Sequence, residues 1–175
     1  MSRRFRRDAL EAHRRNIQVA VACVTVGVVS YAQPEQSRFA EWRALALNNG
    51  RAVPLSGSPL MIRVSQEFLV RREAASDPIE VIGYNYTIEH PNDGELVSFQ
   101  WHAGGKSPID FPHVHIGPAL SRRDSVVRHG EAHKIHVPTG EVSLAGVLRL
   151  AITELGVEPR REDWDAILSR SGARP

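Results

Sequence analysis

The hydrophobic repeat of the chain changes near residue 60, and this change constrains the fold more than any other feature. Ile62, Val64, Phe68 and Val70 alternate with polar side chains, and a period of two is typical of a half-buried β-strand. The segments at both ends of the chain instead repeat at three and four residues, as amphipathic helices do. The sequence therefore predicts an α+β fold in which amino-terminal and carboxyl-terminal helices flank a sheet.

Three further strands are predicted after this one. Residues 79–89 and 96–102 alternate in the same way, and His90-Pro-Asn-Asp-Gly94 between them has the residue types of a tight hairpin turn. Residues 113–117 form a short fourth run, which begins after Pro112. We therefore expect a small antiparallel sheet of about four strands.

The amino-terminal third is predicted to be helical. The apolar run over residues 17–29 favours a core helix, and Pro34 is placed to begin a second helix with Phe39, Trp42 and Leu45 on one face. The carboxyl-terminal segment also repeats as a helix does. Its first helix would be capped by Ser143 and ended by Gly156, and its last would have Pro159 in its first turn and carry Trp164.

A length of 175 residues favours a single domain. Within it we distinguish an amino-terminal helical segment over residues 1–50, a Pro- and Ser-containing connector over residues 51–59, and an α+β domain over residues 60–175. Residues 1–50 either pack with residues 60–175 in one domain or form a separate unit.

The first 32 residues also have the layout of a secretory signal: a basic stretch, an apolar run and small residues up to Ala32. Asp8, Glu11 and the helical period favour a core helix instead. We therefore expect a cytoplasmic protein, with secretion as the alternative. The apolar run is shorter than the ~20 residues that cross a bilayer, so no membrane span is expected.

Basic charge is concentrated at the amino terminus. Six of the first fifteen residues are arginines, whereas the whole chain carries a net charge of only +2. Such a segment attracts an acidic partner or a nucleic acid. The single cysteine, Cys23, excludes an intramolecular disulfide and a zinc site made of cysteines, and its apolar surroundings favour a core position.

Histidine is concentrated elsewhere: seven of the eight lie between His90 and His136. In a strand, His113 and His115 project from the same face, while Val114 and Ile116 would face the core. Three histidines are candidates for a third member of the pair's site, namely His102, His133 and His136, and of these His133 is expected to be exposed to solvent.

Three interpretations of this group stay open. Three imidazoles from His102, His113, His115 and His136 would bind zinc or another divalent metal and leave one position free, as in catalytic zinc sites. Without a metal, His113 and His115 would act as general base and general acid, with His102 beside them. The third interpretation is a polar strand face without chemistry.

A phosphate-containing substrate would require further contacts. Lys106, Arg122 and Arg123 are candidates to hold the phosphate and to stabilise charge in the transition state. Tyr84 and Tyr86, on a neighbouring strand, are candidates to stack on a base.

The order of four segments resembles the TumE family, the small toxins of bacterial and archaeal toxin–antitoxin operons. The segments are Gly-Tyr-Asn-Tyr-Thr-Ile from residue 83, Gly-Glu-Leu-Val-Ser-Phe-Gln-Trp from residue 94, Asp-Phe-Pro-His-Val-His-Ile from residue 110 and Val-Ser-Leu-Ala-Gly-Val-Leu from residue 142. The resemblance covers about residues 80–155, and the chain departs from the pattern in its long amino-terminal extension. It implies a toxin that acts on RNA or translation, an antitoxin partner, and roles for His113 and His115.

We therefore expect a small toxin-like protein that acts on RNA or translation, with ribonuclease chemistry carried out by the paired histidines. The first alternative is a non-enzymatic module that binds a metal or another ligand through the same histidines. The second is an interaction protein that binds an acidic partner through its arginine-rich amino terminus.

Overall fold

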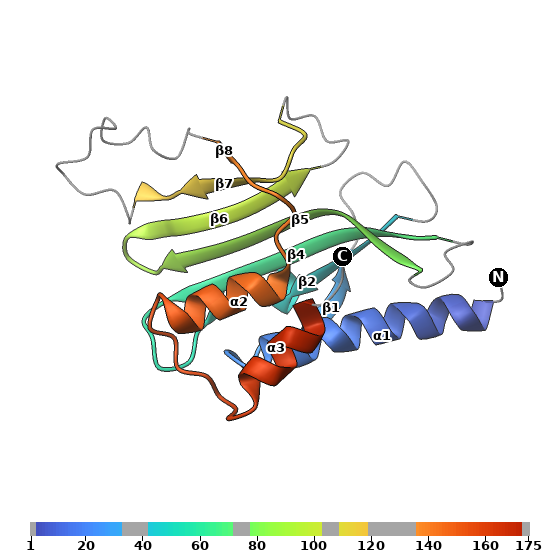
Figure 1. Ribbon diagram of the computed structural model, residues 1–175, viewed down its shortest axis with the longest axis horizontal. Helices are drawn as coiled ribbons and strands as arrows, with labels where there is room; N and C mark the ends of the chain where they lie inside the picture. The colour runs from blue at the N-terminus through green and yellow to red at the C-terminus, as the bar shows by residue number, and fades with distance from the viewer. Residues whose placement is uncertain (1–2, 33–41, 72–77, 103–108, 119–135, 173–175) are drawn as a thin grey trace.

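The computed structural model describes residues 3–32, 42–71, 78–102, 109–118 and 136–172, and Figure 1 shows their arrangement. Within these residues the chain forms three α-helices and an eight-stranded sheet whose strands all pair antiparallel. The α+β class is confirmed, but the sheet is larger than the four strands expected. None of the helices in this part of the chain is long and apolar enough to span a membrane.

The sheet has the strand order β1-β2-β4-β5-β6-β7-β8, and the short β3 pairs with the beginning of β4. The helices are α1 (Arg3–Val21), α2 (Leu144–Thr153) and α3 (Trp164–Gly172), and a 3-10 turn, η1, covers Asn48–Gly50. The strands are β1 (Val29–Ala32), β2 (Trp42–Leu47), β3 (Val53–Pro54), β4 (Met61–Val70), β5 (Ile79–His90), β6 (Gly94–His102), β7 (His113–Ile116) and β8 (Val137–Pro138).

The predicted meander forms the centre of this sheet. Strands β4, β5 and β6 follow one another in the chain and in space. The hairpin between β5 and β6 ends at Gly94, whose φ of +84° lies in the left-handed region that favours glycine. Local period and turn chemistry were therefore sufficient to predict this part of the fold.

The second amino-terminal helix was predicted wrongly. Residues 42–47 form β2, which lies between β1 and β4, and the remainder of the predicted helix, with Phe39, falls outside the described residues. Alanine and leucine favour helix locally, but pairing on both sides and burial of Leu45 and Leu47 override that preference. The expected helix over residues 17–29 is also shorter than predicted, because α1 ends at Val21.

At the carboxyl terminus the signals predicted for α2 are confirmed. The Ser143 hydroxyl accepts a hydrogen bond from the Gly146 amide at 3.1 Å and caps α2. Gly156 follows the helix with a φ of +69°. Pro159 is not in the first turn of the last helix as predicted, because α3 begins only at Trp164 and the Arg160 amide just after Pro159 donates to the Cys23 carbonyl instead.

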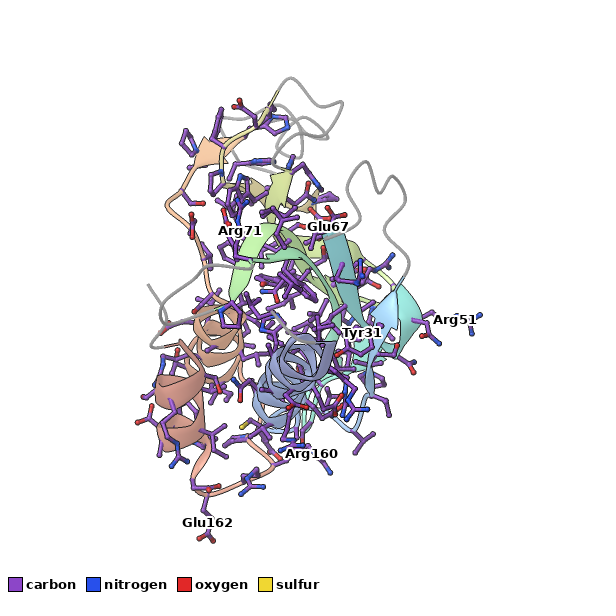
Figure 2. The ribbon with its side chains drawn as sticks, turned by 90° about the vertical axis from the view of Figure 1, so that its right-hand side faces the viewer. Tyr31, Arg51, Glu67, Arg71, Arg160 and Glu162 are labelled. Carbon is purple, nitrogen blue, oxygen red and sulfur yellow. The ribbon has the colours of Figure 1, made fainter. Side chains whose placement is uncertain are left out.

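The three helices pack against one face of the sheet and form a single core with it (Figure 1). Phe68 and Tyr86 from the sheet, Leu148 from α2 and Val21 and Cys23 from the amino-terminal segment are all fully buried in it. The described residues among the first fifty therefore share a core with the rest of the described chain. Figure 2 looks along α1 and shows it packed close to the strands.

Candidate functional site

The candidate site lies where β6, β7 and β8 end the sheet, at the opposite edge from β1 (Figure 1). The antiparallel register places His113 opposite Gln100 and His115 opposite Ser98. On the other side of β7, Pro138 pairs with His113, so that His136, two residues earlier, projects from the same face. Three histidines from two separate parts of the chain thus meet on one face.

These three residues, His113, His115 and His136, are the histidine trio. Each offers one ring nitrogen, and the three nitrogens lie within 4.8 Å of one another. The ring centroids are 4.4–5.1 Å apart. His113 is only 2% exposed, whereas the other two are half-buried, so the group is anchored on one side and reaches solvent on the other.

A backbone carbonyl determines which nitrogen of His113 is protonated. Nδ1 of His113 lies 2.8 Å from the carbonyl oxygen of Phe111, and a carbonyl can only accept, so Nδ1 carries the hydrogen. Nε2 of the neutral ring then has a free lone pair, and it faces Nε2 of His115 at 3.0 Å. The two nitrogens either share a proton or coordinate one cation.

The trio is suited to a metal ion. Zinc binds imidazole nitrogen at ~2.0–2.1 Å in a tetrahedron, and the second nitrogen of a ligating histidine usually donates to a carbonyl or a carboxylate, as His113 does here. Three ligands fill three of the four positions. The fourth would be open to water or substrate, as in catalytic zinc sites.

The fourth histidine considered, His102, stands beside the trio. It lies on the same face as Gln100 and His113, two residues further along β6, and is exposed. It is not one of the three nitrogens that cluster among the described residues. Nearby protein atoms remove water from the ring and lower the pKa of His102, and the positive charges that His113 and His115 would carry lower it further.

Neutral polar groups continue this face toward the centre of the sheet. Gln100 donates from Nε2 to the Ser98 hydroxyl at 2.9 Å, and the Ser98 and Thr87 hydroxyls lie 2.7 Å apart. Both hydroxyls are also hydrogen-bonded to the Asn85 side-chain oxygen, Thr87 at 2.8 Å and Ser98 at 3.2 Å. Ser98, directly opposite His115, is thereby held in one orientation.

Val114 and Ile116 lie on the predicted face, because they pair with Phe99 and Val97, which belong to the core side of β6. Only Val114 packs against the core, and Ile116 is 38% exposed. The reason is position: β7 lies near the edge of the sheet, where the end of the strand is not covered as β4 and β5 are.

The two tyrosines expected to contact a base do not lie on this face. Tyr84 and Tyr86 lie in the core, and their hydroxyls accept hydrogen bonds from the Val142 amide and the Gln66 side chain. They are buried on the helix-covered face, so neither can stack on a base at the histidine trio. Four further candidates fall outside the described residues: Lys106, Arg122, Arg123 and His133.

Two features of the site were not anticipated from the sequence. One is the polar row that Gln100 and Ser98 begin, although the alternation of polar with aromatic residues in 97–101 was a visible signal for it. The other is Phe111, whose carbonyl orients His113 and whose ring stays exposed. A lone phenylalanine in a loop gives no such signal.

Comparisons with protein-family models, with curated proteins and with solved structures each find no match for this chain. The function is therefore inferred from the geometry of the site.

Proposed function

We propose that the histidine trio binds a divalent transition metal, zinc in the first place, and that the protein is a metal-dependent hydrolase. One observation carries this proposal: the three ring nitrogens of His113, His115 and His136 lie within 4.8 Å of one another, and two of the three side chains are partly exposed. Imidazole ligands suit zinc, copper, iron and nickel, whereas magnesium and calcium prefer oxygen.

The chemistry follows from the number of ligands. Three histidines would leave one position for a water molecule, and zinc lowers the pKa of a bound water to about 7. The bound ion would thus supply a hydroxide at neutral pH, the nucleophile that hydrolysis of an ester or phosphodiester requires. The resemblance to TumE toxins supports RNA as the target and an antitoxin as the partner.

Metal analysis of the purified protein tests this proposal. We expect about one zinc per chain after incubation with zinc and gel filtration, and a loss of affinity of about 100-fold or more for His115→Ala, because two ligands do not hold the ion firmly. His90→Ala is the matched control, since His90 pairs with Asp93 at the β5–β6 turn and is not part of the trio. A wild-type protein that retains no zinc, copper or nickel would contradict the metal site.

A second candidate function has its own supporting observation. The 3.0 Å separation of the His113 and His115 Nε2 atoms also suits a metal-free acid–base pair that shares one proton. Such a ribonuclease would cleave RNA equally well with and without a chelator. The metal-dependent enzyme would lose its activity in the chelator and regain it when zinc is added.

A further inference from the structure

The charge of the trio indicates which ligand its open position would take. All three members are histidines, which bind metals as neutral imidazoles, and no carboxylate belongs to the group among the described residues. The charge of a divalent ion would therefore not be compensated by its protein ligands. An anionic group in the fourth position, such as a phosphate oxygen, would be favoured over a neutral one.

An exposed aromatic ring stands beside the histidine trio. Phe111 is 41% exposed, and its ring centroid lies 5.9 Å from that of His113 at an interplanar angle of 73°. The hydrogen bond from His113 to the Phe111 carbonyl also ties the backbone of Phe111 to a ring that would bind the metal. Phe111 is therefore held next to the proposed site.

The exposed ring of Phe111 leaves apolar area that a ligand would cover. Phe111 is not part of the buried core, and a large apolar side chain gains ~1.5–3 kcal/mol when it is fully buried. A planar group stacked on this ring would bury part of that area. Single-stranded nucleic acids use such rings as stacking platforms, because every base has a planar face.

We propose that the site binds a single-stranded nucleotide unit, with a base stacked on Phe111 and the adjacent phosphate at the open position of the metal. This inference rests on the proposed metal site and adds a substrate class and a specific contact residue to it. A nucleotide combines a planar ring with a phosphate a few bonds away. Free phosphate or a phosphorylated aliphatic side chain would use the metal alone and would not depend on Phe111.

Binding of a labelled oligonucleotide tests the proposal without requiring turnover. The probe is a fluorescein-labelled 2′-O-methyl octauridylate, which lacks the free 2′-hydroxyl, titrated with zinc-loaded protein and followed by anisotropy. We expect Phe111→Ala to weaken binding by about fivefold or more, the contribution of at least one stacked base, and Phe111→Trp to retain it. Ile116→Ala is the matched control, because Ile116 is similarly exposed at the other end of the same short strand, and it should change affinity by less than about twofold.

Each other outcome overturns the inference in a distinguishable way. Zinc-loaded protein that does not bind the probe would remove the nucleotide and leave the metal site standing. Binding that is equally strong in Phe111→Ala, and that inorganic phosphate displaces, would show an anion contact only. Equal weakening by Phe111→Ala and Ile116→Ala would assign Phe111 a structural role. Wild-type protein that fails to retain any metal would overturn the proposed function, and this inference with it.

Discussion

At the scale of single residues, one buried chain of hydrogen bonds connects α1 to the sheet. The Gln66 side-chain oxygen accepts from Nε2 of His13 at 2.7 Å, and Nε2 of Gln66 donates to the Tyr86 hydroxyl at 2.9 Å. All three residues are buried, so each of these polar groups depends on its neighbour for hydrogen bonding. The orientation of the Gln66 amide is therefore determined by its two partners.

The ionisation of Tyr86 makes the stability of this arrangement depend on pH. Burial raises the pKa of Tyr86 far above its usual value, while the hydrogen bond from Gln66 opposes the shift. In the unfolded chain the same hydroxyl ionises near pH ~10. The folded state is therefore fully stabilised by this group below about pH 10 and loses stability as the pH rises above it, by up to ~1.4 kcal/mol per pH unit.

Urea unfolding at several pH values measures this effect. We expect the free energy of unfolding of Tyr86→Phe to fall less steeply than that of the wild type between about pH 10 and 11. Tyr31→Phe serves as the comparison: Tyr31 lies on the edge strand β1 and is 44% exposed, and partial burial raises its pKa too, so its removal should change the slope less than Tyr86→Phe does. A slope that is the same in Tyr86→Phe and the wild type would contradict the assignment.

At the scale of secondary-structure elements, the end of β7 requires glycine. A Cβ atom at Gly117 would lie 1.8 Å from the Glu95 carbonyl oxygen, so a side chain there would push β7 away from β6. The Gly117 amide also donates to the Leu96 carbonyl at 2.7 Å. This close approach holds the strand that carries His113 and His115 against its neighbour.

The cap of α2 gives a prediction at the same scale. Replacing Ser143 with alanine removes the acceptor for the Gly146 amide, and we expect a loss of about 0.5–2 kcal/mol in the free energy of unfolding. Thr153→Ala is the control, because the Thr153 hydroxyl is exposed and donates to the Arg149 carbonyl, which lies within the same helix. The prediction fails if chemical denaturation shows equal losses for the two variants.

At the scale of the whole molecule, three segments that are far apart in the sequence meet next to the carboxyl-terminal end of α1. The Ser56 amide donates to the Val24 carbonyl at 2.9 Å, and the Glu158 amide donates to the Ser56 carbonyl at 2.9 Å. Arg160 completes the junction: its amide donates to the Cys23 carbonyl at 2.8 Å and its guanidinium to the Thr25 carbonyl at 3.0 Å. Figure 2 shows Arg160 beneath α1.

This junction predicts that Arg160 contributes more to the free energy of unfolding than the adjacent Arg161. Arg160→Ala removes a cation and its hydrogen bonds from carbonyls just beyond the end of α1, and we expect it to lower the free energy of unfolding by ~1–2 kcal/mol. Arg161 forms only an exposed ion pair with Asp163, so Arg161→Ala should cost at most about 1 kcal/mol. Differential scanning calorimetry compares the two, and a larger loss for Arg161→Ala would contradict the assigned role.

Local features of the sequence were sufficient to predict much of this protein. The alternation of β4, β5 and β6, the turn at Gly94 and the Ser143 cap each depend on neighbouring residues, and each is confirmed. The common projection of His113 and His115 follows in the same way from the period of two in a strand. These properties arise from backbone geometry, which the next few residues determine.

Tertiary structure decided the rest. Residues 42–47 became a strand because β1 and β4 pair with them on either side, and Tyr84 and Tyr86 became core because helices distant in sequence cover their face. His136 reaches the trio only because β8 pairs with β7. Each of these outcomes depends on which distant segments become neighbours, and no local pattern of period, cap or turn specifies that choice.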